Sequence, residues 1–333
     1  MMQYRKLGRT DLIISEIGFG AWGIGGRTAG QTSYGTTDDT SSRRALARAF
    51  DLGITLYDTA PPYGDGHSEE LIGSAFRDRR SQVVLATKVG VEHFGKEPDL
   101  SPQALRHSLE GSLRRLGSDY VDLLQIHSLD IAALRRNPAI LETLNAMVDE
   151  GKTRALAMSA KSPDDAVAAV TEFGFKIVQI NLNMMDLRAQ QNGFLALAAE
   201  RGIGVIARTP LCFGFLSGTI GTDTQFPDGD HRNGWSRAQI ERWIEGASCL
   251  HDAAGRPEGQ TRAQVALRFC LSYPAVAVVI PGILTAAEAD ENAAASTAGP
   301  LPSAARARVE ELNRTMDFFV PRAAASQMQG VPA

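Results

Sequence analysis

The chain has 333 residues and a formal net charge of −4, with 44% hydrophobic and 22% charged residues. This composition is ordinary for a globular protein, and the lack of a basic excess argues against nucleic acid or an anionic membrane as a partner. Neither a signal-peptide pattern nor a run near the ~20 apolar residues of a membrane span is found, so we expect a cytoplasmic protein.

Short apolar runs alternate with amphipathic stretches along almost the whole chain. A hairpin is predicted over residues 3–15, turned by the sequence GRTD. Strands are then predicted at 14–19, 54–58, 83–88, 121–127, 155–159, 177–181, 204–209 and 276–281. Eight strands, each followed by a helix, favour a parallel sheet closed into a (β/α)8 TIM barrel of the α/β class. We expect residues 1–333 to form this single domain, with long loops at the C-terminal rim and a poorly ordered tail at 321–333.

The predicted helices carry start signals. Serine followed by proline, at Ser101 and Ser162, is typical of an N-cap with proline in the first turn. Ser68 is the expected cap of a helix whose first turn holds Glu69 and Glu70. The polar stretch 221–235 after the seventh strand is either a lid over a site or a surface loop. Capping boxes are expected at Ser236/Gln239, Thr261/Gln264 and Thr285/Glu288.

A glycine motif follows the first predicted strand. The sequence GFGAWG, residues 18–23, matches the G-x-G-x-x-G fingerprint of dinucleotide-binding domains. That fingerprint must open a helix, whereas the residues after it here are rich in glycine and threonine and have no helical period. The motif therefore predicts a glycine-rich loop rather than a Rossmann site.

Ionisable side chains stand at the ends of three consecutive strands. Asp58, Lys88 and His127 each end an apolar run, and Tyr63 follows in the loop after the second strand. Because the site of a TIM barrel gathers at the C-terminal ends of its strands, we expect these four side chains to converge. Lys88 beside Tyr63 would lower the pKa of the phenol, and Asp58 would keep Lys88 charged. His127 would bind a substrate carbonyl or help to relay the proton, with Tyr63 as the general acid.

These residues include no metal-ligand cluster and no nucleophile–base pair, so a bound cofactor would have to supply the reducing equivalents. Seven motifs along the chain are informative together: YRKLGRTDLIISEIGFGAWGIGG, DTAPPYGDGHSEELIG, VLATKVG, SLRRLGSDYVDLLQIH, LNAMVDEGKTRALAMSA, GIGVIARTPL and VIPGILTAAEADEN. In these motifs the chain resembles the aldo-keto reductase superfamily along almost its whole length. The resemblance implies a (β/α)8 fold and NAD(P)H-dependent reduction of an aldehyde or ketone to an alcohol, with Asp58, Tyr63, Lys88 and His127 as the catalytic set.

The resemblance also implies a nicotinamide site. Ser159 and Gln179 stand where the family holds the carboxamide, but Ala160 replaces the usual asparagine. Arg208 stands where many members stack an aromatic ring; its plane can stack, while its charge should disfavour the oxidised cofactor. The full expected cofactor set is Trp22, Ser159, Gln179, Arg208, Pro210, Leu211, Gly214, Gly282, Glu288, Glu291 and Asn292.

The adenosine end departs from the pattern of NADP-dependent members. Thr219 and Glu288 replace a lysine and an arginine that bind the 2′-phosphate. A carboxylate opposes a phosphate but can accept a hydrogen bond from a free ribose hydroxyl, although Glu288 also fits a purely structural capping box. Arg232 is an alternative phosphate ligand. NADP(H) is therefore the family's default cofactor, and NAD(H) competes with it here.

Aromatic side chains in the rim loops are expected either to line a substrate pocket or to pack only within their loops. They suit a small aldehyde, a ketone or a sugar-like carbonyl. Oxidation of an alcohol or lactol by the same residues stays open, as does a cofactor-binding protein like the potassium-channel β subunits. A Schiff-base aldolase at Lys88 is disfavoured by its neighbour Asp58. The residues concerned are Trp22, Phe94, Phe213 and Trp235, with Cys212 beside Phe213.

Overall fold

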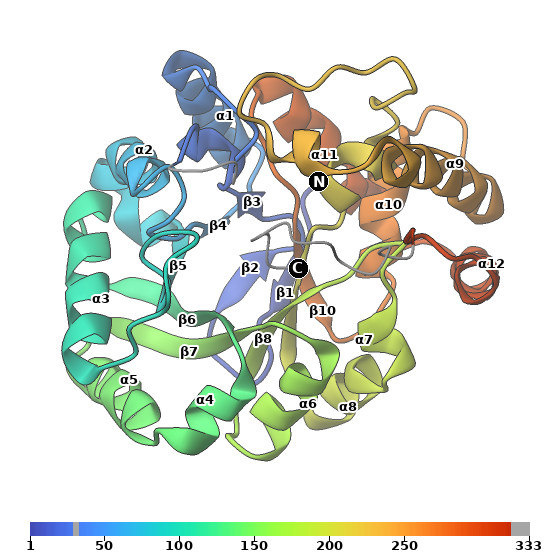
Figure 1. Ribbon diagram of the computed structural model, residues 1–333. Helices are drawn as coiled ribbons and strands as arrows, with labels where there is room; N and C mark the ends of the chain where they lie inside the picture. Colours follow the sequence, from blue (N-terminus) through green and yellow to red (C-terminus); the bar gives the residue numbers. More distant parts are fainter. Residues whose placement is uncertain (29–32, 321–333) are drawn as a thin grey trace.

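The computed structural model describes residues 1–28 and 33–320, so the tail predicted at 321–333 lies outside the described residues. Eight parallel strands follow one another around one sheet in sequence order. Bridges from Ile17 to Val279 and from Gly20 to Gly282 join the first and last strands, which closes the predicted barrel (Figure 1). The strands are β3 (Phe19–Gly20), β4 (Leu56–Asp58), β5 (Val84–Val89), β6 (Val121–Leu129), β7 (Thr153–Ala160), β8 (Ile177–Asn181), β9 (Gly204–Arg208) and β10 (Val276–Ile280).

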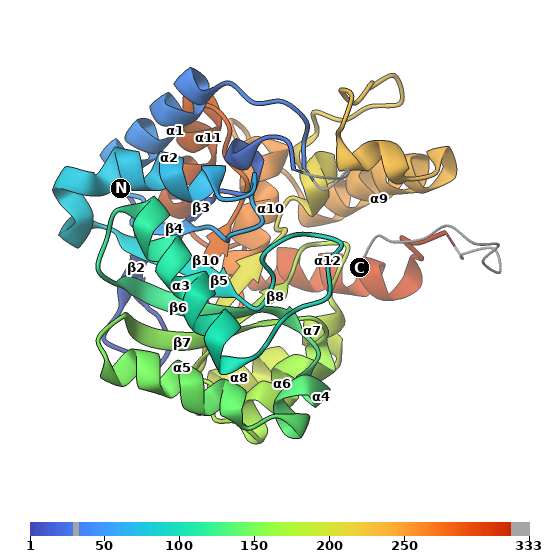
Figure 2. The same cartoon turned by 60° about the vertical axis from the view of Figure 1, so that its left-hand side comes forward.

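Helices surround the strands, as Figures 1 and 2 show. Among the described residues, none of them is long and apolar enough to cross a membrane. The helices are α1 (Asp39–Asp51), α2 (His67–Phe76), α3 (Pro102–Leu116), α4 (Ile131–Arg136), α5 (Ala139–Asp149), α6 (Pro163–Thr171), α7 (Arg188–Gln191), α8 (Phe194–Arg201), α9 (Arg237–Ala254), α10 (Arg262–Leu271), α11 (Ala286–Ala298) and α12 (Ser303–Thr315), with 3₁₀ turns η1 (Gly23–Gly25), η2 (Arg77–Gln82), η3 (Cys212–Ser217) and η4 (His231–Gly234).

A hairpin of β1 (Tyr4–Lys6) and β2 (Ile13–Ser15) plugs the end of the barrel where the strands begin. Leu7, Leu12 and Ile14 are buried in one cluster with apolar side chains of the barrel strands. Gly8 lies so close to the first residue of β9 that a Cβ there would collide with the β9 backbone. With this end filled by apolar side chains, the opposite end is left for a polar site.

The strand predicted at 14–19 is wrong at its start, because residues 14 and 15 belong to the hairpin, whereas Ile17 and Phe19 do pair with barrel strands. Ile14 pairs with Arg5 in the hairpin, and the barrel strand β3 begins only at Phe19. Glu16 lies between them, buried, and its carboxylate accepts a hydrogen bond from Arg5 at 2.6 Å. The apolar run is therefore divided between two sheets at a buried glutamate, whose ion pair with Arg5 the hydrophobicity of the run does not reveal.

Most of the predicted helix starts are confirmed, but the capping box at Ser236/Gln239 does not form and Ser68 is not a cap. Ser101 and Ser162 cap α3 and α6, and full capping boxes are present at Thr261 and Thr285. Ser236 caps α9, but its partner Gln239 binds the backbone of residues 318 and 320 instead of closing the box.

Ser68 does not cap α2. The N-cap is Gly66, in the left-handed conformation, and α2 begins at His67. The Ser68 hydroxyl is buried and donates to the Ala21 carbonyl at 2.9 Å, so it ties α2 to the loop after β3.

Candidate active site

Polar side chains occupy the inward face of the barrel strands at their C-terminal ends. Side chains alternate between the two faces of a strand. Val84 and Ala86 on β5 belong to the apolar core inside the barrel, so Lys88 continues the same inward row. The row on β6 runs in the same way from Leu123 to His127. The sequence thus brings ionisable groups to one end of an otherwise apolar interior.

Lys88 is the centre of this group. Its side chain is 1% exposed, and its Nζ donates to Asp58 Oδ1 at 2.6 Å, to the Thr59 carbonyl at 2.9 Å and to Tyr63 Oη at 3.2 Å. Three acceptors take up the three N–H groups of an ammonium, which satisfies the buried charge. The predicted convergence of Asp58, Tyr63 and Lys88 therefore rests on direct hydrogen bonds.

Burial and charge act on these pKa values in opposite senses. Burial lowers the pKa of Lys88, but Asp58 and Tyr63 together raise it above its ordinary value. Burial raises the pKa of Tyr63, and the positive charge of Lys88 opposes this only in part. Lys88 thus has the expected effect on Tyr63, but the net shift is upward and not downward as predicted, because the influence of burial on this partly buried side chain is the larger one.

His127 meets Tyr63 edge to face, with the ring centroids 5.9 Å apart. Its Nδ1 is buried and makes no hydrogen bond to any described residue. Burial, and then the charges of Lys88 and Arg208, hold the pKa of His127 well below its ordinary value. A neutral imidazole with an unpaired nitrogen therefore lies beside the ring of Tyr63.

Asp58 has two further partners. Its Oδ2 accepts from Gln125 Nε2 at 2.7 Å and from Gln179 Nε2 at 2.8 Å. Gln179 Nε2 also donates to Gln125 Oε1 at 3.0 Å. Gln179 was predicted for the cofactor, but Gln125 was missed, although it lies two residues before His127 on the same face of β6.

Arg208 extends this network across the barrel mouth. Its Nη1 donates to Ser159 Oγ at 2.8 Å, its Nη2 to the Ala160 carbonyl at 2.9 Å and its Nε to Asn181 Oδ1 at 2.7 Å. Ser159 in turn lies 3.4 Å from Gln179 Oε1. Asn181 is a second residue that the sequence analysis missed. The three predicted nicotinamide-site residues thus share one hydrogen-bonded surface with Asp58.

This surface suits a nicotinamide group. Ser159 Oγ and Gln179 Oε1 can exchange hydrogen bonds with a carboxamide, and the guanidinium of Arg208 offers a flat face held by three bonds. A Cβ at Gly282, beside the end of β3, would meet nothing within 4 Å, so the space there is open. Ala160 offers a cofactor only its backbone, and Arg208 already uses that carbonyl.

The glycine-rich loop after β3 supports the loop that carries Tyr63. Residues 23–25 form the short turn η1 and open no helix, which confirms that GFGAWG is not a Rossmann motif. A Cβ at Gly25 would lie 2.7 Å from the carbonyl carbon of Tyr63 and 2.8 Å from Gly64 N. The two backbones can therefore approach this closely only because glycine has no side chain.

Backbone strain is concentrated around the same rim. Among the described non-glycine residues, those in the left-handed region lie near the C-terminal end of β6 or in the loops after β4 and β9. Such conformations cost on the order of 1–3 kcal/mol each and are retained where the surrounding structure requires them. Ser128 also marks a register shift in β6 directly after His127. The strained residues are Asp65, Ser128, Thr209, Cys212 and Phe213.

The predicted aromatic residues fall into two groups. Phe94 packs against both Tyr63 and His127, with centroid distances of 6.3 Å. Trp22, Phe213 and Trp235 instead pack around His231 of η4 at 4.9–5.4 Å. Of the predicted substrate residues, Phe94 is thus in ring contact with Tyr63 and His127.

The stretch 221–235 is anchored across the rim. His231 N donates to the Ser33 carbonyl at 2.8 Å, and Asp230 forms bridges with residues 33 and 34. Arg232 binds both oxygens of Asp230 and lies over the ring of Tyr34. Because its charge is paired with Asp230, Arg232 is poorly suited to the phosphate contact considered for it.

The residues expected at the adenosine end lie on α11 and in the loop after β9. Glu288 Oε2 accepts from the backbone N–H groups of residues 284 and 285, which gives it the structural role considered for it. Glu291 is tied to α10 through its carbonyl, which accepts from Gln264, and Asn292 is buried. Thr219 exchanges a hydrogen bond with Ser217. Of the remaining predicted cofactor residues, Pro210 and Leu211 follow β9, and Gly214 lies within η3.

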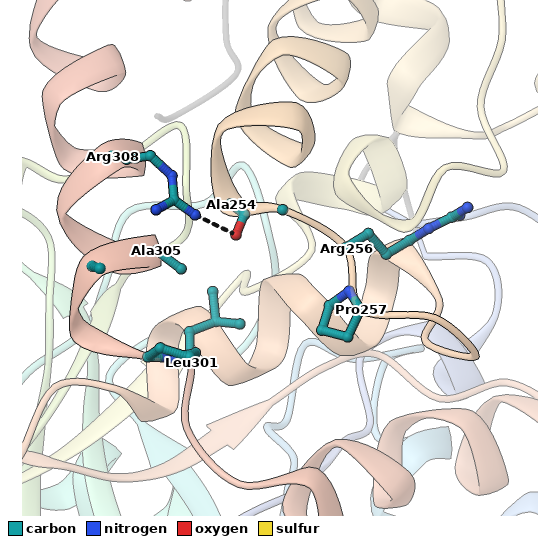
Figure 3. Close-up of a pocket in the computed structure, with 9 residues that line it drawn as sticks. Ala254, Arg256, Pro257, Leu301, Ala305 and Arg308 are labelled. Atoms are coloured by element: carbon teal, nitrogen blue, oxygen red, sulfur yellow. Dashed lines mark hydrogen bonds between the residues drawn. The ribbon is translucent and has the colours of Figure 1, made fainter.

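A pocket of about 370 Å³ opens elsewhere, between the end of α9 and the start of α12 (Figure 3). Its walls include Leu301, Ala305 and Pro257. Arg308 at its edge donates to the carbonyls of Ala253 and Ala254, where α9 ends. None of the predicted site residues lines it, so this pocket is separate from the group around Lys88.

Comparison with known proteins agrees with the fold. The sequence pattern of the Aldo/keto reductase family matches residues 16–314. Aldo-keto reductase YhdN of Bacillus subtilis is 32% identical over 292 residues, 84% of this chain and 85% of that protein. The NADH-specific methylglyoxal reductase of Escherichia coli is 35% identical over 237 residues, 67% of this chain and 71% of that protein.

The solved structure of a glycerol dehydrogenase from Gluconobacter oxydans is also similar. The match has a TM-score of 0.76 and 26% identity, and covers 98% of this chain and 99% of that one. Since the family pattern spans most of the barrel and the relatives align over most of both chains, the chain belongs to the aldo/keto reductase family and is an oxidoreductase enzyme.

Proposed function

We propose that this oxidoreductase reduces a small aldehyde or ketone to an alcohol, with Tyr63 as the general acid. The observation that carries the proposal is Lys88, which donates to both Tyr63 Oη and Asp58 Oδ1. When bound, the nicotinamide cofactor supplies the hydride. Reduction also needs a proton at the carbonyl oxygen, and the hydroxyl of Tyr63 is the proton source that the site offers.

The protonation state of Tyr63 favours reduction. Because burial raises the pKa of Tyr63, the phenol keeps its proton at neutral pH. As negative charge develops on the substrate oxygen, the adjacent Lys88 ammonium stabilises the phenolate that remains after proton transfer. The raised pKa of Lys88 keeps that ammonium charged, which also argues against a Schiff-base mechanism.

His127 orients the substrate in this proposal. Its pKa lies well below the ordinary value, so the ring is neutral near pH 7 and carries one N–H. Tyr63 and His127 lie together at the barrel mouth, so a carbonyl oxygen there could accept from both. Phe94 packs on the rings of these two residues and provides an apolar wall that suits a small carbonyl compound.

For the cofactor, we propose that NAD(H) serves at least as well as NADP(H). Glu288 places a carboxylate at the start of α11, and Thr219 is neutral. A relative that is 35% identical is named as NADH-specific. The cation to test is Arg262, whose side chain passes over Gly218 beside Thr219. If a 2′-phosphate is read there, Arg262→Ala should lower catalytic efficiency with NADPH and leave that with NADH unchanged.

The proposed reaction is tested by following oxidation of NADH and NADPH with a panel of aldehydes, ketones and sugars. Tyr63→Phe should lower kcat by about 10²- to 10⁴-fold, the usual contribution of a general acid. Tyr34→Phe is the matched control, because it removes another rim hydroxyl that has no bond to Lys88. Full activity in Tyr63→Phe would show that this residue is not the acid.

The reverse reaction, oxidation of an alcohol or lactol, is the second candidate. The glycerol dehydrogenase named above is similar along its whole chain. Oxidation needs the phenolate of Tyr63, and the raised pKa of that residue disfavours this form at neutral pH. We therefore expect oxidation to gain rate as pH rises and reduction to be faster at neutral pH. A non-catalytic cofactor-binding protein would bind NAD(P)H and turn over no member of the panel.

A further inference from the structure

We propose that Gln125 is a positioning residue that joins the proton-donating group to the nicotinamide-binding group. The proposal rests on the proposed function, because Gln125 acts through Asp58 and Gln179. It lies inside the barrel with no exposed surface, where a polar side chain is costly unless its hydrogen bonds are made. Its neighbours on β5 and β7 are Lys88 and Ala157.

The chemistry of Asp58 fixes the orientation of both amides. An ionised carboxylate only accepts hydrogen bonds, so Gln125 and Gln179 must each turn Nε2 toward Asp58 Oδ2. Gln125 Oε1 then faces Gln179 and accepts its second N–H at 3.0 Å. Gln125, Gln179 and Asp58 therefore form a closed triangle.

The triangle decides what Gln179 can offer a cofactor. Both of its N–H groups are used inside the triangle, so only Oε1 faces Ser159 and the expected carboxamide site. Without Gln125, one N–H would lose its acceptor, and the bond to Asp58 alone would hold the amide. Gln125 thus helps Asp58 to hold Gln179 as an acceptor and not as a donor.

The same side chain acts on the acid. Lys88 binds Oδ1 of Asp58, while the two amides bind Oδ2, so the carboxylate is fixed at both oxygens. Loss of one amide donor leaves the negative charge of Asp58 less neutralised, so Lys88 and Tyr63 experience a stronger negative field. A stronger negative field makes Tyr63 a weaker acid, and the rate of reduction should fall.

Gln125→Glu distinguishes a hydrogen-bonding role of Gln125 from a role in packing alone. When protonated, the new carboxylic acid can donate to Asp58 and accept from Gln179, as the amide does. When ionised, it would set a second carboxylate against Asp58, so its pKa should be raised. The other titratable groups around it are Lys88, Tyr63 and His127, with Arg208 as the remaining nearby charge.

The experiment compares pH profiles of kcat for wild type, Gln125→Glu and Gln125→Met. Gln125→Met keeps the length of the side chain without its hydrogen bonds, and should lower kcat about 10- to 100-fold at every pH, the scale of a hydrogen bond to a charged group. Gln125→Glu should approach the wild-type kcat at low pH, and its kcat should fall as pH rises and the new carboxylic acid ionises. Its pH profile should therefore have a falling limb that the wild-type profile lacks. Gln103→Glu on the exposed face of α3 controls for added charge.

Cofactor affinity gives a second readout. Gln125→Met should raise the dissociation constant of reduced cofactor about 2- to 10-fold, which is the scale of one neutral hydrogen bond. Quenching of protein fluorescence by the cofactor measures this constant. The proposal is overturned if Gln125→Met keeps the wild-type kcat and dissociation constant, or if Gln125→Glu and Gln125→Met have the same pH profile. Tyr63→Phe, run beside them, separates the cases: full activity there contradicts the proposed function itself.

Discussion

Gly25→Ala is expected to damage catalysis through Tyr63 without touching any ionisable side chain. Gly25 does not adopt the left-handed conformation, so an alanine there is strained only by space. The new methyl would lie 2.7 Å from the carbonyl carbon of Tyr63, whereas ordinary contact begins at 3.4 Å. The two segments must therefore separate by about 0.7 Å.

That displacement affects the hydrogen bond between Lys88 and Tyr63, on which proton donation by Tyr63 depends. Tyr63 Oη lies 3.2 Å from Lys88 Nζ, near the limit of a hydrogen bond, so a further shift weakens it steeply. A misplacement of about 1 Å can cost on the order of 10²-fold in rate. We expect Gly25→Ala to lower kcat about 10- to 100-fold while Lys88 stays bound to Asp58.

The assay is steady-state reduction of an active carbonyl from the panel, with the thermal midpoint measured for each variant. Gly221→Ala is the matched control, because its Cβ would meet nothing within 4 Å. It should keep both kcat and Tm. If Gly25→Ala also kept kcat within twofold, the close approach of these loops would not determine the position of Tyr63, and the reasoning would be refuted.

Two further predictions concern Arg208 and His251. Arg208, held next to Ser159, should make the enzyme bind reduced cofactor roughly tenfold more tightly than oxidised cofactor, because the charge of Arg208 repels the cationic ring of the oxidised form. Arg208→Gln should bring the two dissociation constants closer together, as measured by fluorescence titration. Burial lowers the pKa of His251 to about 4, so the unfolded chain binds a proton that the folded one does not between pH 6.5 and 4. As pH falls across that window, the free energy of unfolding of the wild type should fall by about 3 kcal/mol. The fall should be smaller in His251→Gln. Urea denaturation at each pH measures both.

The convergence of the ionisable residues could be predicted because it depends on two local facts. A parallel strand alternates its side chains, and the strands of a barrel end at one rim. Asp58 and Lys88 each end an apolar run, so sequence position is enough to bring them together. Their hydrogen bond of 2.6 Å is the result.

The direction of the pKa shift at Tyr63 could not be predicted in the same way. The sequence shows that Lys88 is near, and therefore that one influence lowers the pKa. It does not show how far the ring is buried, because that depends on several loops, among them the one that carries Phe94. Burial turns out to be the larger influence, so the sign was reversed.

The position of Gln125 inside the barrel could be predicted from the sequence, although its role was missed. In LLQIH it stands two residues before His127, so strand alternation places it on the same inward face. A neutral amide at that place has no titration or nucleophilic chemistry to draw attention, and an apolar side chain would fill the interior at less cost. A polar group in the inward row must therefore be explained by its partners, and those partners are Asp58 and Gln179. The same rule selects Asn181 on β8, which accepts from Arg208. Reading every inward position of the barrel strands for unexplained polarity, rather than only their charged ends, would have found both residues from the sequence.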